Sequence, residues 1–305
     1  MQTSNNRVLK RIANFLKHPH NYFVMFLGLF LVFICISYAW MIYYGFATSF
    51  KSVNDFAENL LGFPRRFVTY NYEIAWTRLF YRIPLAEGGY EKVYFPRLFL
   101  NTFLIACPPV LITLFTQSIV SYVCSKYRFG FNKILHLLVV FVFVMPSVNA
   151  LGQKIMFLKS IGFYDNYWAL LYGSIIFADY NFLIFYGSWK GIPNDYVEAA
   201  KIDGAGHFYI FFKIMFPLIR TQFIVLFVMA FIAKWKDYMQ VMTTMPSWPV
   251  LSLALLSFQW DTTTIVAWPT VQMAACMIVS LPCIVLYLVF QPLMVGNLTM
   301  GGLKA

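Results

Sequence analysis

Residues Glu198-Ala199-Ala200-Lys201-Ile202-Asp203-Gly204-Ala205, followed by Ile214-Met215-Phe216-Pro217, form a polar break between two apolar stretches. Pro193 suits the first turn of a helix, where its missing N–H would have no partner, and acidic groups favour that end of the helix dipole. Gly204 is placed to end this helix in a left-handed conformation. The stretch therefore predicts a short helix, a glycine turn, a second helix over 207–216 that is apolar enough to lie on the membrane surface, and a membrane span that opens at Pro217. Taken alone, this pattern fits either a contact element for a partner protein or an ordinary interfacial helix pair.

The composition around this break is that of an integral membrane protein. The 305 residues are 60% hydrophobic and only 11% charged, whereas soluble domains are nearer half apolar and a quarter charged. The formal net charge is +11, but much of it flanks apolar stretches, as expected for lysine and arginine retained on cytoplasmic loops. No basic patch alternates with stacking aromatic residues, which argues against nucleic-acid binding.

Several apolar regions approach the length of about 20 residues that a bilayer requires. The first follows basic residues, but it is far longer than the apolar region of a signal peptide, so we expect it to stay attached as a signal anchor. A shorter stretch, Val250–Phe258, suits a re-entrant or interfacial helix better than a full crossing. The six regions expected to span the membrane are Tyr22–Phe46, Phe99–Val123, Ile134–Leu151, Trp168–Trp189, Pro217–Ala233 and Val271–Leu293.

The basic residues predict an orientation. The N-terminal segment carries four basic residues and no acid, and the segment after the second region holds Lys126, Arg128 and Lys133, again without an acid. Both segments therefore belong in the cytoplasm. With six spans, the C-terminus and the polar break at Glu198 are cytoplasmic too, and the long stretch 51–97 is extracytoplasmic. That stretch mixes charged and aromatic residues, which fits a folded loop, a membrane-surface layer, a partner contact or the lining of an opening.

Residue types that carry catalysis elsewhere form no recognisable pattern in this chain. It has no G-x-x-x-x-G-K-[ST] loop, so it lacks the Walker means of holding ATP phosphates, and it has no G-x-S-x-G motif. Its four histidines form no metal-ligand motif. Its five cysteines lie in or beside apolar regions, as expected for inert thiols. We therefore predict that the chain is not an enzyme and binds no metal or cofactor.

Polar side chains inside or beside the apolar regions are costly and are candidates for function. Amides, carboxylates and aromatic rings suit a sugar, whose faces combine hydroxyls with apolar C–H surface. Hydrogen bonding between helices is the alternative role for such residues. The candidates for a hydrophilic path are Asn149, Gln153, Asp179, Asn181 and Gln272.

The spacing of the polar break resembles the EAA loop of permease subunits in bacterial binding-protein-dependent ABC importers, with Phe216 in place of a leucine. That loop reads E-A-A, three residues, G, nine residues, I, any residue, L-P. Other residues, from Asn101 to the C-terminus, resemble the second permease subunit of sugar-type systems such as the maltose permease. They are Asn101-Thr102, Ser121-Tyr122, Lys126-Tyr127-Arg128-Phe129, Met145-Pro146, Ile192-Pro193, Phe216-Pro217-Leu218, Trp235-Lys236-Asp237 and the tail from Gly296 to Ala305, together with Ser49-Phe50-Lys51 near the first span.

This resemblance implies the type I ABC importer permease fold, an all-α integral membrane protein with six transmembrane helices and a cytoplasmic coupling helix. It places the chain in the bacterial inner membrane. It also implies three kinds of partner: a homologous second permease, a pair of cytoplasmic ATPase subunits that use ATP and Mg, and an extracytoplasmic solute-binding protein. Glu198 would face a basic group of the ATPase, and Gly204 would allow the turn. The coupling residues implied are Glu198, Ala199, Ala200, Asp203, Gly204, Ala205 and Pro217.

Two departures from the family pattern leave the solute open. Thr221 stands where a proline is frequent, and Lys236 follows Trp235 where asparagine is frequent. We expect a carbohydrate, in particular an oligosaccharide, with another solute such as a polyol phosphate as the alternative for the same machinery. An ion-coupled secondary transporter would need inverted repeats and ionisable residues at mid-membrane, for which Asp179 is the only clear candidate.

The expected organisation follows from the spans and the resemblance. A cytoplasmic N-terminal segment over 1–21 precedes a first transmembrane helix over 22–46 and an extracytoplasmic loop over 47–98. The permease core then occupies 99–293 and contains the coupling loop 190–216, and 294–305 form a cytoplasmic tail.

Overall fold

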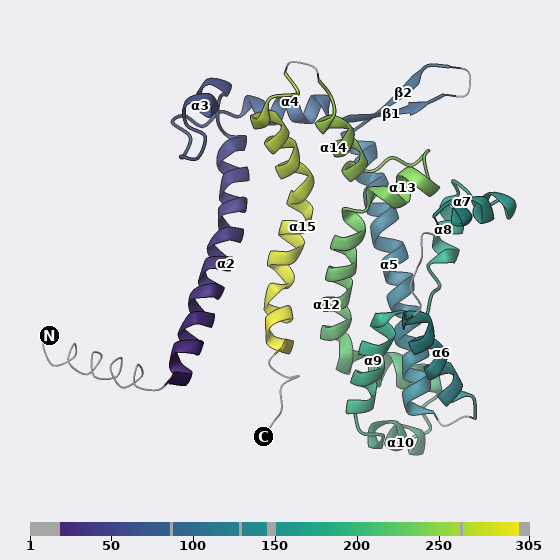
Figure 1. Ribbon diagram of the computed structural model, residues 1–305. Coiled ribbons are helices and arrows are strands. Elements are labelled where there is room, and N and C mark those ends of the chain that lie inside the picture. The colour runs from purple at the N-terminus through teal and green to yellow at the C-terminus, as the bar shows by residue number, and fades with distance from the viewer. Residues whose placement is uncertain (1–18, 86–87, 128–129, 145–150, 263–264, 299–305) are drawn as a thin grey trace, which may run out of the picture. The chain divides into compact units, whose positions relative to one another are not determined.

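The computed structural model (Figure 1) describes residues 19–85, 88–127, 130–144, 151–262 and 265–298, whose regular secondary structure is helical apart from one β-hairpin. The described residues form two compact units, one within Met1–Ala75 and Ala267–Met277 and the other within Trp76–Val266 and Ile278–Ala305. The longer elements are α2 (Pro19–Ser49), α5 (Phe95–Lys126), α6 (Asn132–Val144), α7 (Leu151–Ser160), α9 (Tyr180–Gly191), α12 (Phe216–Trp235) and α15 (Pro269–Leu298). The shorter ones are α3 (Val53–Glu58), α4 (Tyr70–Arg78), α8 (Tyr167–Gly173), α10 (Asp195–Ile202), α11 (His207–Tyr209), the π-helix η1 (Ile210–Met215), α13 (Tyr238–Thr244) and α14 (Leu251–Gln259).

Four helices among the described residues are long and apolar enough to cross a membrane. They cover Tyr22–Ser49, Phe95–Lys126, His207–Trp235 and Pro269–Met294. These helices contain the first, second, fifth and sixth regions predicted to span the membrane. The chain is therefore a multi-pass membrane protein.

The fourth predicted span differs from a single long helix, and the third is described only in part. In the third, α6 ends at Val144, and residues 145–150 lie outside the described part of the chain, as do Met145-Pro146 of the family resemblance. The fourth region, expected as one crossing over Trp168–Trp189, is divided into α8 and α9 by residues 174–179, which are not helical. At the end of this break Asp179 caps the start of α9, where its side chain accepts from the Tyr180 N–H.

In the first unit, the end of α2 is held by polar side chains. The Asn71 amide donates to the carbonyl oxygens of Ser49 (2.9 Å) and Lys51 (2.8 Å) and accepts from the Thr270 hydroxyl (3.4 Å). The Lys51 ammonium is buried and donates to the backbone oxygens of Asn59 (2.6 Å) and Leu60 (3.2 Å). Burial lowers the pKa of Lys51, against the opposing effect of a nearby carboxylate. The chain that follows α2 is thus held by hydrogen bonds together with ring contacts of Phe50 with Phe67 and Tyr72.

In the second unit, α5 packs against α9 and α12 (Figure 1). Pro108 and Pro109 lie within α5, as expected for a kink-tolerant membrane helix. The predicted short helix over 250–258 is confirmed as α14.

The stretch before α5 contains a hairpin that an all-α prediction did not include. Strands β1 (Phe80–Pro84) and β2 (Tyr90–Tyr94) pair antiparallel, with Phe80 opposite Tyr94 and Pro84 opposite Tyr90. The hairpin is rich in aromatic and β-branched residues, which favour strands.

Candidate functional site

The polar break forms a helix and a tight turn whose backbone groups are paired. α10 ends at Ile202, and Gly204 has a φ of +77°, the left-handed conformation that the sequence predicted. The Gly204 N–H donates to the Lys201 oxygen (3.1 Å), and the Ala205 N–H donates to the Ala200 oxygen (2.9 Å). These two bonds form a Schellman motif, which satisfies carbonyls that the helix end would otherwise leave free. The turn is therefore sharply defined.

The two faces of α10 differ. Val197 and Ala200, three residues apart, are buried against the protein, whereas Glu198 and Ala199 are exposed. Ala200, one of the coupling residues that the resemblance implies, packs into this chain's own core. Of the other residues predicted at this loop, Asp203 and Gly204 are exposed and Ala205 is half-buried.

Large apolar side chains project outward beside these polar groups. Ile202 is 86% exposed and Phe208 is 84% exposed, and Tyr196 and Tyr209 are also exposed. Figure 1 places α10 at the end of the second unit opposite the β1–β2 hairpin. Exposed apolar residues of this size on a short, well-fixed helix are typical of a surface that binds another protein.

The loop is attached to the end of α5 by polar contacts. The Lys126 ammonium donates to the Ile192 carbonyl oxygen and to Asn194 Oδ1, the latter at 3.1 Å. The Tyr127 hydroxyl lies 2.8 Å from His207 Nδ1, and the Lys201 ammonium lies over the Tyr127 ring. These contacts hold both sides of the Gly204 turn against the same helix end.

Beneath the loop lies a tightly packed aromatic core. Trp189 is fully buried, and its indole N–H donates to the Ser118 oxygen at 3.1 Å. Its ring meets Tyr122 edge-on and also contacts Phe211. Val197 and Ala200 of α10 belong to the same core, so α10 packs against residues of α5 and α9.

The second helix of the loop is continuous with the next span, which corrects the prediction that it would be a separate helix that ends before Pro217. α11, η1 and α12 run on without a break from His207 to Trp235. Pro217 lies in the first turn of α12, and at the junction the Phe216 N–H donates to the Phe211 oxygen five residues back. A π-type turn here accommodates the proline, because its missing N–H no longer interrupts a regular ladder.

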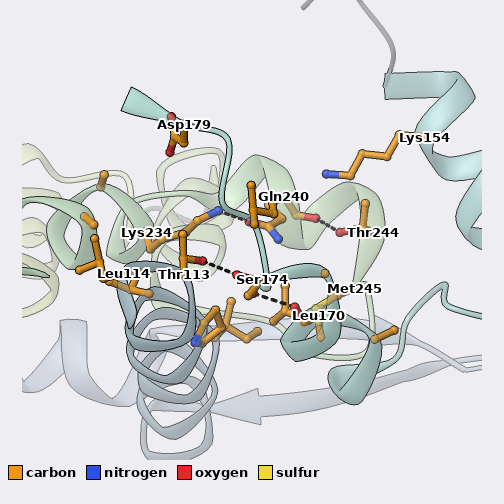
Figure 2. Close-up of a pocket in the computed structure, with 18 of the residues that line it drawn as sticks. Thr113, Leu114, Lys154, Leu170, Ser174, Asp179, Lys234, Gln240, Thr244 and Met245 are labelled. Atoms are coloured by element: carbon orange, nitrogen blue, oxygen red, sulfur yellow. Dashed lines mark hydrogen bonds between the residues drawn. The ribbon is translucent and has the colours of Figure 1, made fainter. Parts of the chain in front are cut away.

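A second feature of this unit is a cavity of about 420 Å³ beside the α8–α9 break (Figure 2). This volume is in the usual range for small-ligand sites. The Thr113 hydroxyl of α5 donates to the Ser174 oxygen at 2.8 Å and so satisfies a carbonyl that the break leaves outside a helix. Irregular backbone within a membrane protein is tolerated where it lines such a cavity. Polar residues on the wall are Thr113, Lys154, Asn166, Ser174, Asp179, Tyr180, Asn181, Lys234, Gln240 and Thr244.

The structure brings together two of the five predicted path residues. Asp179 and Asn181 line the cavity. Gln153 is exposed on α7 and does not line it, and Gln272 belongs to the other unit. Asn149 lies outside the described residues.

Sequence reasoning missed the two lysines of this wall. Lys154 extends from α7 toward the side of the cavity where Gln240 lies, and Lys234 donates to the Gln240 side-chain oxygen (Figure 2). Lys234 also lies 3.5 Å from Asp237. Both lysines adjoin predicted spans, where flanking positive charge is expected. Apolar residues precede and follow each lysine in the sequence, and this pattern could have identified them as candidates.

Comparison with known proteins supports the same fold. Residues 97–297 match the family of binding-protein-dependent transport system inner membrane components. The maltodextrin transport system permease protein MdxG of Bacillus subtilis is 28% identical over 236 residues, covering 72% of this chain and 82% of that protein. The probable starch degradation products transport system permease protein AmyC of Thermoanaerobacterium thermosulfurigenes is 27% identical over 293 residues, covering 94% of this chain and 98% of that protein.

A solved structure is similar over almost the whole chain. It is a bacterial ABC transporter involved in the import of the acidic polysaccharide alginate, of which one chain aligns with a TM-score of 0.70 and 18% identity, covering 89% of this chain and 96% of that chain. At this identity the likeness supports the fold. Because the family model matches about two-thirds of the sequence, the chain belongs to the family of inner membrane components of binding-protein-dependent transport systems.

Proposed function

We propose that this chain is the transmembrane permease subunit of an ATP-driven importer that moves a carbohydrate, in particular an oligosaccharide. The names of relatives such as MdxG and AmyC support this substrate class. In this proposal the chain crosses the membrane six times, with both termini and α10 in the cytoplasm and the hairpin outside. The third region, of which α6 is described, and the divided fourth region each count as one crossing.

The observation that carries the proposal is the rigid, outward-facing α10. Glu198 and Ile202 of α10 and Phe208 of α11 are exposed, so one charged and two large apolar side chains lie near the Gly204 turn, whose Gly204 and Ala205 N–H groups are paired. We propose that a cytoplasmic ATPase subunit binds this surface and that Glu198 faces a basic group there. We call α10 and the Gly204 turn the handle. Its shape depends on Ala199, Asp203, Gly204, Ala205 and Pro217, and Ala200 supports it through its packing in the core.

The other parts of the machine follow from this role. A second, homologous permease would complete the translocation path, and an extracytoplasmic solute-binding protein would deliver the solute. ATP and Mg would be used by a pair of ATPase subunits, since the sequence of this chain has no phosphate-binding loop. The purified chain alone should then hydrolyse no ATP.

The test is uptake of a labelled maltodextrin by proteoliposomes that hold the whole complex, compared for the unaltered chain and Glu198→Lys. Charge reversal at a partly desolvated contact sets like charges against each other. We expect normal abundance, lower ATPase co-purification and a loss of uptake of about tenfold or more. Asp195→Lys, an exposed acid in the first turn of the same helix, controls for the change in charge.

Two outcomes would reject the proposal. One is normal uptake and normal ATPase binding by Glu198→Lys. The other is cysteine labelling that places residue 203 outside the cell while residue 75 is inside.

A further inference from the structure

The segment after α3 folds back along α2 instead of leading away from it. α2 ends at Ser49, yet the loop 59–67 contacts Tyr43 of this helix. The Leu61 carbonyl oxygen lies 3.5 Å from the Tyr43 hydroxyl, and the rings of Phe63 and Tyr43 stack with their centroids 6.2 Å apart. The helix rises about 9 Å from Tyr43 to Ser49, and helical side chains lean toward the N-terminus. The loop, which belongs to the same unit, therefore returns to a level short of the end of α2 (Figure 1).

That level is where a bilayer changes from hydrocarbon to headgroups. The apolar helix over Tyr22–Ser49 has 28 residues, so it is about 42 Å long. This length matches a bilayer with its headgroup layers, about 40–45 Å, rather than the hydrocarbon core alone, which is about 30 Å. Near its end, Trp40 and Tyr43 pack with their ring centroids 5.3 Å apart. Tryptophan and tyrosine are the residues enriched at this depth of a membrane.

The loop places outward-facing apolar side chains at this level. Leu60, Leu61, Phe63 and Phe67 are each more than half exposed. A cluster of this kind marks a surface that contacts a partner or a membrane. The most apolar part of α2 has no buried residue within the described part of the chain, so lipid surrounds this helix where it crosses the membrane. The cluster is continuous with that surface, which favours lipid as its partner.

Hydrogen bonds fix the backbone of the loop, so the exposure of these side chains does not come from a loose segment. The Asn59 side chain accepts from the Gly62 N–H at 2.8 Å and donates to the Phe63 oxygen at 3.0 Å. The buried Lys51 ammonium donates to the Asn59 and Leu60 oxygens. A Cβ at Gly62 would clash with the Asn59 side chain, so this turn needs glycine. The apolar side chains are thus presented in one fixed arrangement.

We propose that the loop 59–67 is a membrane anchor that binds phospholipid, with its four exposed apolar side chains inserted beside α2 and Arg66 bound to a headgroup phosphate. An acyl chain would lie in an open apolar groove of about 300 Å³ on α2, which shares Tyr43 with the loop contact. The inference needs only that α2 crosses the membrane, and it depends neither on the solute nor on the contact with the ATPase. The groove is lined by Ile36, Ala39, Trp40 and Tyr43.

The charges of the loop are compatible with a headgroup. Arg65 pairs with Glu58 at 2.5 Å and lies 3.7 Å from Asp55, so the acids beside the loop are neutralised and would not repel a phosphate. Arg66 is exposed next to Phe67. Its apolar stem can lie among the inserted side chains while the guanidinium reaches the headgroups and donates charge-assisted hydrogen bonds to a phosphate.

The experiment is photocrosslinking of the whole complex, both in native membranes and in nanodiscs of phosphatidylethanolamine and phosphatidylglycerol. p-Benzoylphenylalanine replaces Phe63 or, as the matched control, Ala57, which is exposed on the short helix α3. After irradiation, mass spectrometry identifies the molecule attached at each position. We expect phospholipid at position 63, at a yield severalfold higher than at position 57.

Three outcomes would overturn the inference. They are attachment at position 63 mainly to a protein in native membranes, equal lipid yields at positions 63 and 57, and no attached lipid at either position. The first outcome would make the loop a contact for another subunit or for a solute-binding protein.

Variants separate the apolar part of the anchor from the charged part. Leu61→Asp places a charge among lipid chains and should lower lipid attachment at position 63 severalfold, whereas Ala57→Asp should not. Arg66→Gln should lower the share of phosphatidylglycerol among the attached lipids, because the attraction to an anionic headgroup is lost. Arg78→Gln is its control, since Arg78 is exposed on α4 outside the loop. Unchanged attachment in Leu61→Asp would reject the insertion, and an unchanged lipid share in Arg66→Gln would reject the phosphate contact.

Discussion

The two breaks in the helical pattern of the second unit, at Gly204 and at residues 174–179, are opposite in character. The Gly204 turn is closed by its own backbone, with the N–H groups of Gly204 and Ala205 both paired. The α8–α9 break is held partly by another element, since the Thr113 hydroxyl of α5 donates to the Ser174 oxygen alongside the Ile176 N–H. The break adjoins a cavity lined by Asn181, whose side-chain oxygen has no partner among the described residues. A handle that passes on force has to be rigid, whereas a solute path needs groups that remain free for a ligand. The difference between the breaks thus matches the two roles that we propose for them.

The largest expected effect is on the core that supports the handle. Trp189→Ala removes a fully buried ring and its hydrogen bond to Ser118 and should lower the stability of the protein by about 3–5 kcal/mol. Trp168→Ala, at a position that is 75% exposed, should have little effect. Thermal unfolding of the purified complex in detergent measures both. Equal stability of the two variants would show that the handle is not supported by this core.

Gly204→Val tests the turn itself. A Cβ at Gly204 would meet no atom within 4 Å, so the penalty comes from the positive φ alone and is roughly 1–3 kcal/mol. We expect normal abundance of the protein and uptake reduced about tenfold or more, because the altered turn would change the orientation of α10 relative to its proposed binding partner. Gly206→Val is the matched control, since Gly206 has an extended backbone and equally open surroundings. Normal uptake by Gly204→Val would contradict the handle role.

Lys126→Met tests how the handle is attached to α5. It removes the hydrogen bonds to Ile192 and Asn194, and a bond from a charged donor contributes about 1.5–3 kcal/mol. The amount of solute taken up per ATP hydrolysed should fall in Lys126→Met while the ATPase still binds. Lys126→Arg should keep most of this ratio. Lys190→Met is the control, because Lys190 is exposed and contacts only the face of the Tyr186 ring. An unchanged ratio of uptake to hydrolysis would remove Lys126 from the coupling path.

The smallest effect on stability is expected at the cavity. Asn181→Leu removes a buried oxygen without a partner, so stability should stay within about 1 kcal/mol of the unaltered protein, or rise. Uptake should nevertheless decrease. Gln117→Leu is the comparison: Gln117 is fully buried, both of its polar side-chain atoms lack partners, and it does not line the cavity. If both variants transport equally well, the unpaired Asn181 oxygen has no part in solute binding.

Much of the α10 loop could be predicted from local sequence because its structure is local. A left-handed Gly204 and acidic residues in the first turn follow from capping rules that act within a few residues. The burial of Ala200 could not be predicted, since it depends on which face of α10 meets α5, α9 and η1. The continuous helix through Pro217 was also missed, because a π-type turn there depends on packing around Phe211.

The sequence by itself determined that the chain is a multi-pass helical membrane protein, where its long apolar helices lie, and that a glycine turn separates two helices before Pro217. Hydropathy and capping are properties of neighbouring residues, so no knowledge of distant contacts was needed. Only the tertiary structure decided that the fourth apolar region is divided and that Lys154, Asn181 and Lys234 line one cavity. These residues come from α7, α9 and α12, and their proximity is set by helix packing, which the spacing along the chain does not encode.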